Sequence, residues 1–183
     1  MAKIITMMLL MCALIGQVFA TDASESDDWG KEEIAGMVPV NGTYLNEQYG
    51  FGVSVLQTRA YQPPGRDPDH GMIILLGAGR KITVSAMYDA AFYGSTKSQL
   101  DPRLQGEHFE SVKRSATVLD GKPAAQAMLQ NGKNITKVVV QRRNEEDGIL
   151  YELELITNKG DQNEDLKTFD NIIRTFKTHV LPK

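Results

Sequence analysis

Three short turns in the second half of the chain constrain its fold more than any other feature. Each contains an Asp-Gly or Asn-Gly pair, at residues 120–121, 131–132 and 147–148. Such pairs accept the positive backbone φ angles that two-residue β-hairpins need. The runs between the turns have the length and composition of strands. The pattern predicts a four-strand antiparallel meander, with strands at residues 111–118, 123–130, 136–142 and 149–157.

The last of these strands indicates which face of the sheet is buried. Tyr151, Leu153 and Leu155 point to one face, and Glu152 and Glu154 point to the other. This alternation is typical of an antiparallel sheet that is packed on one face and solvated on the other.

A helix is predicted after this strand, at the end of the chain. Asp161 or Asn163 can cap its N-terminus, and apolar residues then recur at spacings of three and four. The apolar stripe consists of Leu166, Phe169, Ile172, Ile173 and Phe176. Because such a stripe must be buried, we expect the helix to lie on the sheet.

The first half of the domain carries the same kinds of signal. Residues 61–69 hold three prolines and a glycine, which predicts a loop because proline lacks the amide donor of a strand. A short helix is predicted from residue 96, with Leu100 and Leu104 on one side. Extended segments are predicted at residues 37–40, 49–58, 72–76 and 81–88. The fold class is therefore α+β, an antiparallel sheet with helices packed on it.

The first 20 residues have the pattern of a secretory signal. Lys3 precedes an apolar run, and Val18 and Ala20 are the small residues expected before a cleavage site after Ala20. We expect residues 21–40 to be an acidic, flexible leader and residues 41–183 to form a single domain. The protein is then periplasmic or secreted, with no membrane span after cleavage.

Charge and cysteine content narrow the function classes further. Removal of Lys3 with the signal leaves 19 basic and 23 acidic residues, a net charge of −4, which argues against nucleic-acid binding. Cys12 is the only cysteine and is read as an apolar residue of the signal, so the mature chain has neither disulfides nor cysteine chemistry. We expect a domain held together by its core alone.

Three segments resemble the PsbP-like superfamily, which includes PsbP and DcrB-type envelope proteins. They are GFGVSV at residues 50–55, LDGKPAAQAM at 119–128 and the closing run from GILYELEL to NIIRTF at 148–176. The resemblance covers about residues 44–180. It implies an α-β-α sandwich and a non-enzymatic binding or assembly role, and it transfers no functional residues. The chain also resembles uncharacterised bacterial exported proteins.

Candidate chemistry is sparse. Asp67, Asp69 and His70 could contribute to a metal site, but the loop around them has the composition of turns, and we predict no metal and no cofactor. His108 and His179 complete the set of possible bases, and no Gly-x-Ser-x-Gly nucleophile motif accompanies them. We therefore expect a protein that is not an enzyme.

The sequence favours binding to another protein in the cell envelope, as an assembly factor, an inhibitor or an immunity-type protein. The alternatives are a carrier of a small apolar ligand and, third, a hydrolase. The predicted contact surface combines the stiff proline-rich loop with aromatic residues near the end of a strand. It consists of Tyr61, Arg66, Asp67, Asp69, His70, Tyr88, Phe92 and Tyr93.

Overall fold

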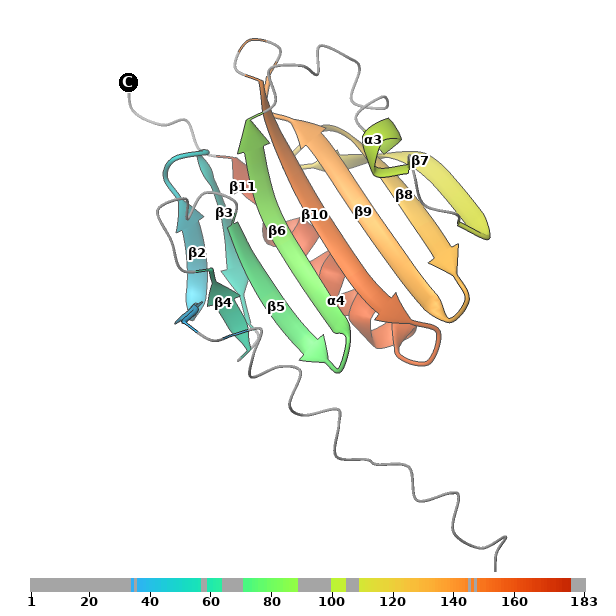
Figure 1. Ribbon diagram of the computed structural model, residues 1–183. Coiled ribbons are helices and arrows are strands. Elements are labelled where there is room, and N and C mark those ends of the chain that lie inside the picture. Colours follow the sequence, from blue (N-terminus) through green and yellow to red (C-terminus); the bar gives the residue numbers. More distant parts are fainter. Residues whose placement is uncertain are drawn as a thin grey trace, which may run out of the picture.

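Two antiparallel sheets and one long helix build the part of the chain that the computed structural model describes (Figure 1). The described residues are 34, 36–56, 59–63, 71–88, 100–104, 109–144, 146 and 148–178. None of the helices among them is long and apolar enough to cross a bilayer.

The large sheet has eight antiparallel strands, and its second half is the predicted meander. From one edge to the other the order is β1 (Val38–Pro39), β4 (Ala60–Gln62), β5 (Gly71–Gly77), β6 (Arg80–Tyr88), β10 (Ile149–Asn158), β9 (Asn134–Arg142), β8 (Lys122–Asn131) and β7 (Ser111–Leu119). β10 pairs with both β6 and β9, so the last strand of the large sheet in chain order lies in the middle of that sheet. The four strands of the meander confirm the sequence prediction.

The small sheet has the order β11 (Lys177–Thr178), β3 (Phe51–Val55) and β2 (Gly42–Asn46). The sequence predicted β3 but missed β2 and β11. Both are short, and β11 becomes a strand only by pairing with β3 across more than 120 residues. Residues 61 and 62, predicted to lie in a loop, belong instead to β4, which ends where Pro63 follows.

The long helix α4 (Gln162–Thr175) and the small sheet cover one face of the large sheet (Figure 1). Phe169 and Phe176 are fully buried, and Leu166 and Ile173 pack against the same core, which confirms the predicted stripe. The ring of Phe51 stacks on Phe176 at 5.5 Å, and Tyr151 meets Phe176 edge-on at 5.3 Å. Three aromatic rings thus join the two sheets to the end of the helix.

The other face of the large sheet is also partly buried. The four-residue helix α3 (Asp101–Leu104) lies on this face, opposite α4 (Figure 1). Glu152 is only 4% exposed, so the expectation that its face is solvated is wrong. A second apolar cluster lies here, formed by Leu100, Ala125, Ala127, Leu129, Val138, Val140 and Leu150. The described fold is thus richer in sheet than the balanced α-β-α sandwich that we expected.

The buried position of Phe169 allows a direct test of how much α4 contributes to the stability of the fold. Phe169→Ala should lower the free energy of unfolding by about 3–5 kcal/mol, because the ring is fully buried and a cavity remains. Leu45→Ala is the matched control, since Leu45 is 58% exposed and its loss should cost less than about 0.5 kcal/mol. Both values come from chemical denaturation. Equal midpoints for Phe169→Ala and wild type would remove α4 from the core.

Candidate binding groove

The structure describes two of the eight residues in the predicted contact surface. Tyr61 is half-buried in β4, and Tyr88 is 66% exposed at the end of β6. Tyr61 pairs with Ile73 on β5, and Ile73 pairs with Thr83 on β6, so Tyr61 is level with Thr83. Tyr88 lies five residues beyond Thr83 on β6, which corresponds to about 16 Å along the strand. The strands therefore do not bring these two tyrosines together. The surface remains a prediction, because Arg66, Asp67, Asp69, His70, Phe92 and Tyr93 lie outside the described residues.

The three histidines considered as possible bases, His70, His108 and His179, are likewise not among the described residues. Within the described ranges, no three His, Cys, Asp or Glu side chains are grouped so that they could hold a metal ion.

The described residues form an open groove between α4 and the outer strands of the meander. Its volume is about 630 Å³. Three lining residues come from the strands and five from the helix: Thr117, Gln126, Lys137, Lys167, Asp170, Asn171, Ile173 and Arg174. None of them was a candidate site residue in the sequence.

The position of α4 explains why the sheet is hollowed there. The helix packs mainly on β10 and β3, so the outer strands of the meander, β8 and β7, extend beyond it. The side chains of these strands that line the groove are small or polar, including Thr117 on β7 and Gln126 on β8. Gln126 donates a hydrogen bond from Nε2 to Ser115 Oγ at 2.9 Å, which fixes the floor.

The groove is cationic although the whole chain is acidic. Lys137, Lys167 and Arg174 face a single lining carboxylate, Asp170. Lys137 Nζ lies 2.9 Å from Asp170 Oδ1 and 5.4 Å from the centre of the Phe169 ring. Lys137 and Asp170 therefore neutralise each other, and the positive charge of the groove comes from the other two cations.

Lys167 and Arg174 have no carboxylate partner among the described residues. Arg174 donates a hydrogen bond from Nη2 to Asn171 Oδ1, a neutral acceptor on the same helix. Both cations are exposed at the wall of the groove. They can therefore attract an anionic group without first giving up an internal ion pair.

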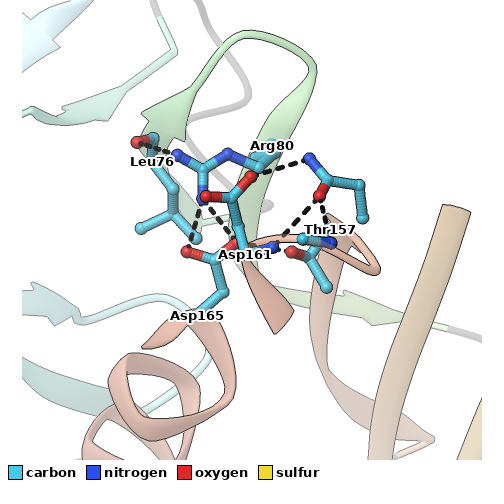
Figure 2. Close-up of polar contacts among 7 residues, drawn as sticks. Leu76, Arg80, Thr157, Asp161 and Asp165 are labelled. Atoms are coloured by element: carbon cyan, nitrogen blue, oxygen red, sulfur yellow. Dashed lines mark hydrogen bonds and ion pairs between the residues drawn. The ribbon is translucent and has the colours of Figure 1, made fainter. Parts of the chain in front are cut away.

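A partly buried ion pair holds the N-terminal end of this wall (Figure 2). Arg80 Nη1 donates to both carboxylate oxygens of Asp165, at 2.9 and 2.8 Å, and Thr157 Oγ1 donates to Asp165 Oδ2. Arg80 Nη2 also donates to the carbonyl of Leu76 at 3.1 Å, and its Nη1 lies 3.4 Å from Asp161. These contacts tie the β5–β6 hairpin and β10 to the first turn of α4.

Asp120 holds the segment that follows α4. It lies in the β7–β8 turn, where its φ of 48° and that of Gly121, 73°, match a type I′ hairpin. Its carboxylate accepts hydrogen bonds from the amide and hydroxyl of Thr178, at 2.8 and 2.7 Å, and pairs with Lys177 at 3.0 Å. Burial by itself would raise the pKa of Asp120, but the hydrogen bonds from Thr178 and the charge of Lys177 outweigh it and lower the pKa.

Sequence reasoning missed the groove because its charges are far apart in the chain. Lys137 belongs to a strand, whereas Lys167 and Arg174 belong to a helix about 30 residues later. One signal was present: Lys167, Asp170, Asn171 and Arg174 follow the i, i+3, i+4, i+7 spacing of one helix face. Read beside the apolar stripe, this polar stripe marks the wall of the groove.

Loss of the Asp165 carboxylate should destabilise the fold. Asp165→Ala should lower the free energy of unfolding by about 3 kcal/mol, because it removes the two-oxygen partner of the partly buried Arg80 and leaves only the longer contact to the more exposed Asp161. Thr157→Val keeps the ion pair and removes one hydrogen bond to a charged group, so it should cost less, about 1.5–2 kcal/mol. Denaturant titration measures both. An Asp165→Ala protein as stable as Thr157→Val would show that the ion pair does not hold the helix.

The Asp120 contacts should appear in the pH dependence of stability. Because the folded pKa lies below the ordinary 3.8, the contribution of this carboxylate is complete above pH 3.8 and is lost as pH falls through the folded pKa. The difference in unfolding free energy between wild type and Asp120→Asn should therefore be constant from pH 5 to 7 and shrink below about pH 4. A difference that grows on acidification would contradict the lowered pKa.

Known proteins match this chain in structure but not in sequence. No protein-family model and no curated protein matches it. The solution structure of cyanobacterial PsbP (CyanoP) from Synechocystis is similar, with a TM-score of 0.50, 13% identity, and coverage of 78% of this chain and 95% of CyanoP.

Two crystal structures align less well. LpqN of Mycobacterium tuberculosis, involved in cell envelope biogenesis, has a TM-score of 0.42, 15% identity, and coverage of 79% of this chain and 91% of LpqN. A protein from Bacteroides thetaiotaomicron has a TM-score of 0.49 and 12% identity; the alignment covers 76% of this chain and 49% of that one. The similarity to CyanoP confirms the resemblance inferred from the sequence at the level of architecture: the chain has the PsbP-like fold.

Proposed function

We propose that this chain is an exported, non-catalytic protein that binds a protein partner in the cell envelope through the groove between α4 and the outer strands. The observation that carries the proposal is the charge of the groove. Lys167 and Arg174 lack carboxylate partners among the described residues and line a hollow of about 630 Å³. Unpaired cations in a concave surface of an acidic chain favour an acidic ligand.

The form of the groove favours a macromolecular ligand over a small apolar one. A carrier encloses its ligand in a largely apolar cavity, which removes most of the ligand surface from water. This groove is open to solvent, and of its eight lining side chains Ile173 is the aliphatic one. A segment of another protein can lie along such a groove and be held by charge and by shape.

The chemistry of the lining favours binding over hydrolysis. Its ionisable groups are two lysines, one arginine and an aspartate that is already paired with Lys137. A hydrolase needs a base within hydrogen-bond reach of a nucleophile. An ion-paired carboxylate beside two cations that have no carboxylate partner among the described residues is suited to charge recognition instead.

The location of the partner follows from the N-terminal sequence. The first 20 residues have the pattern of a secretory signal, so the partner is expected in the periplasm or outside the cell. An assembly factor, an inhibitor and an immunity-type protein all fit such a binding role.

Charge reversal in the groove tests the proposal. The Lys167→Glu, Arg174→Glu double variant should reduce recovery of the partner at least about tenfold after crosslinking in the native host, because attraction becomes repulsion. The partner is identified by mass spectrometry and its binding is then measured with purified proteins.

A second double variant makes the matched control. Arg59→Glu with Lys133→Glu changes the net charge equally, and both residues are exposed and outside the groove lining. The control should retain the partner. Equal recovery by the groove variant and the control would contradict a binding role for the groove.

A further inference from the structure

The strand beside the groove lies at the edge of the large sheet, as far as the described residues show. β7 is the last strand of the large sheet and pairs with β8 without interruption over nine residues, from Ser111 to Leu119. Among the described residues, no strand pairs with its other side. A regular strand with an open side offers a row of backbone donors and acceptors to an extended segment.

The hairpin fixes which backbone groups of β7 point to the open side. In a two-residue hairpin, the residues that flank the turn form a hydrogen-bonded pair, and here these are Leu119 and Lys122. With a period of two, the odd-numbered residues of β7 bond to β8. The outward amides and carbonyls therefore belong to Val112, Arg114, Ala116 and Val118.

The two faces of this edge differ in chemistry. Lys113 is level with Met128 and Lys137 across the strands, so it lies on the face that carries the groove and adds a further cation there. On the opposite face, Val112 is 43% and Val118 58% exposed. Arg114 lies between them on this face, where it is paired with Asp101 at 2.6 Å. An edge with cations that lack carboxylate partners among the described residues on one face, and exposed valines beside an internal ion pair on the other, is complementary to a strand that alternates acidic and aliphatic residues.

We propose that β7 takes an extended segment of the partner as a ninth strand of the sheet, with acidic side chains toward the groove and aliphatic side chains on the opposite face. This inference rests on the proposed binding function and specifies its ligand. Hydrogen bonds to the outward backbone groups of β7 supply affinity, and Lys113, Lys167 and Arg174 select the acidic register.

Charge argues for a partner segment over a second copy of this chain. β7 contains Lys113 and Arg114 and no acidic residue. Pairing of two β7 strands would therefore bring the Lys113 side chains of both copies to one junction without a carboxylate from either strand. Arg114 is already paired with the nearby Asp101, with Nη1 2.6 Å from Oδ1, so its charge is compensated within the same chain.

The test uses the full mature chain and a defined probe, the fluorescently labelled peptide Glu-Val-Glu-Val-Glu-Val-Glu. Binding is measured by anisotropy. The peptide should bind, and a block peptide of the same composition, four Glu followed by three Val, should bind at least about tenfold more weakly because it cannot place acids on one face. Absence of binding at millimolar probe, or equal binding of the two peptides, would overturn the proposal.

Two methylated probes test the strand pairing without changing the protein. In an antiparallel addition, the residues that bond to β7 share the face of Val112 and Val118, so they are the valines of the probe. Methylation of the valine amides should abolish binding, and methylation of the internal glutamate amides should be tolerated. The reverse result indicates parallel pairing and still supports strand addition. Equal binding of both methylated probes would overturn it.

The groove variants separate failure of this inference from failure of the proposed function. If both methylated probes bind as well as the unmethylated one, but the probe does not bind to the Lys167→Glu, Arg174→Glu variant, then the strand-pairing proposal is wrong and the proposed function of the groove stands. A self-associating chain whose dimer the probe dissociates would identify a second copy as the occupant and overturn the proposal. Binding that appears only after deletion of residues 21–33 would identify the acidic leader as the occupant and also overturn it.

Discussion

The ion pair between Arg80 and Asp165 is the contact on which the candidate site depends. Asp165 is 3% exposed and accepts from both Arg80 and Thr157, so its charge is buried but fully partnered. Breaking such a pair leaves one charge in a poorly solvated position, which costs far more than a surface pair. The pair therefore determines where the first turn of α4 lies relative to the sheet.

Once α4 is fixed, the groove and the open edge follow from simple geometry. The helix covers β10 and reaches β3, and the aromatic contact between Phe51 and Phe176 holds its other end. A sheet of eight strands is wider than one helix, so the outer strands remain uncovered on that face. The polar stripe of α4 then faces the strands across an open groove, and β7 forms the outer rim.

The two anchors of α4 are of different kinds. At its start, a buried ion pair gives a fixed geometry through charge-assisted hydrogen bonds. After its end, Asp120 accepts the backbone amide of Thr178 and so ties β11 to the β7–β8 turn. This second anchor connects the hairpin of the edge strand β7 to the small sheet.

Local signals in the sequence were enough to predict the meander and α4. The turn at Asp120 and Gly121 and the stripe that includes Phe169 need only neighbouring residues to be recognised. β2 and β11 were missed because they exist through pairing with distant β3, which no local pattern reveals. The buried second face was missed because Glu152 was taken as a solvated residue, although apolar side chains of β8 and β9 surround that face.

The groove could not be predicted from the sequence, for the same reason. The polar stripe that contains Lys167 can be seen in the sequence, but Lys137 is brought beside it only by the packing of the helix on the sheet. Composition and placement favoured the proline-rich loop instead. Tyr61 and Tyr88 are separated along the sheet, and the remaining residues of that predicted surface lie outside the described residues.

Amide hydrogen exchange of β7, followed by NMR with and without the alternating acidic peptide, tests the binding site most directly. In the free protein, the amides of Val112, Arg114, Ala116 and Val118 should exchange rapidly while those of the intervening residues are protected by β8. Addition of the peptide should protect the outward amides as well. Unchanged exchange along β7, with new protection around Tyr61 and Tyr88 instead, would contradict the groove and favour the proline-rich surface.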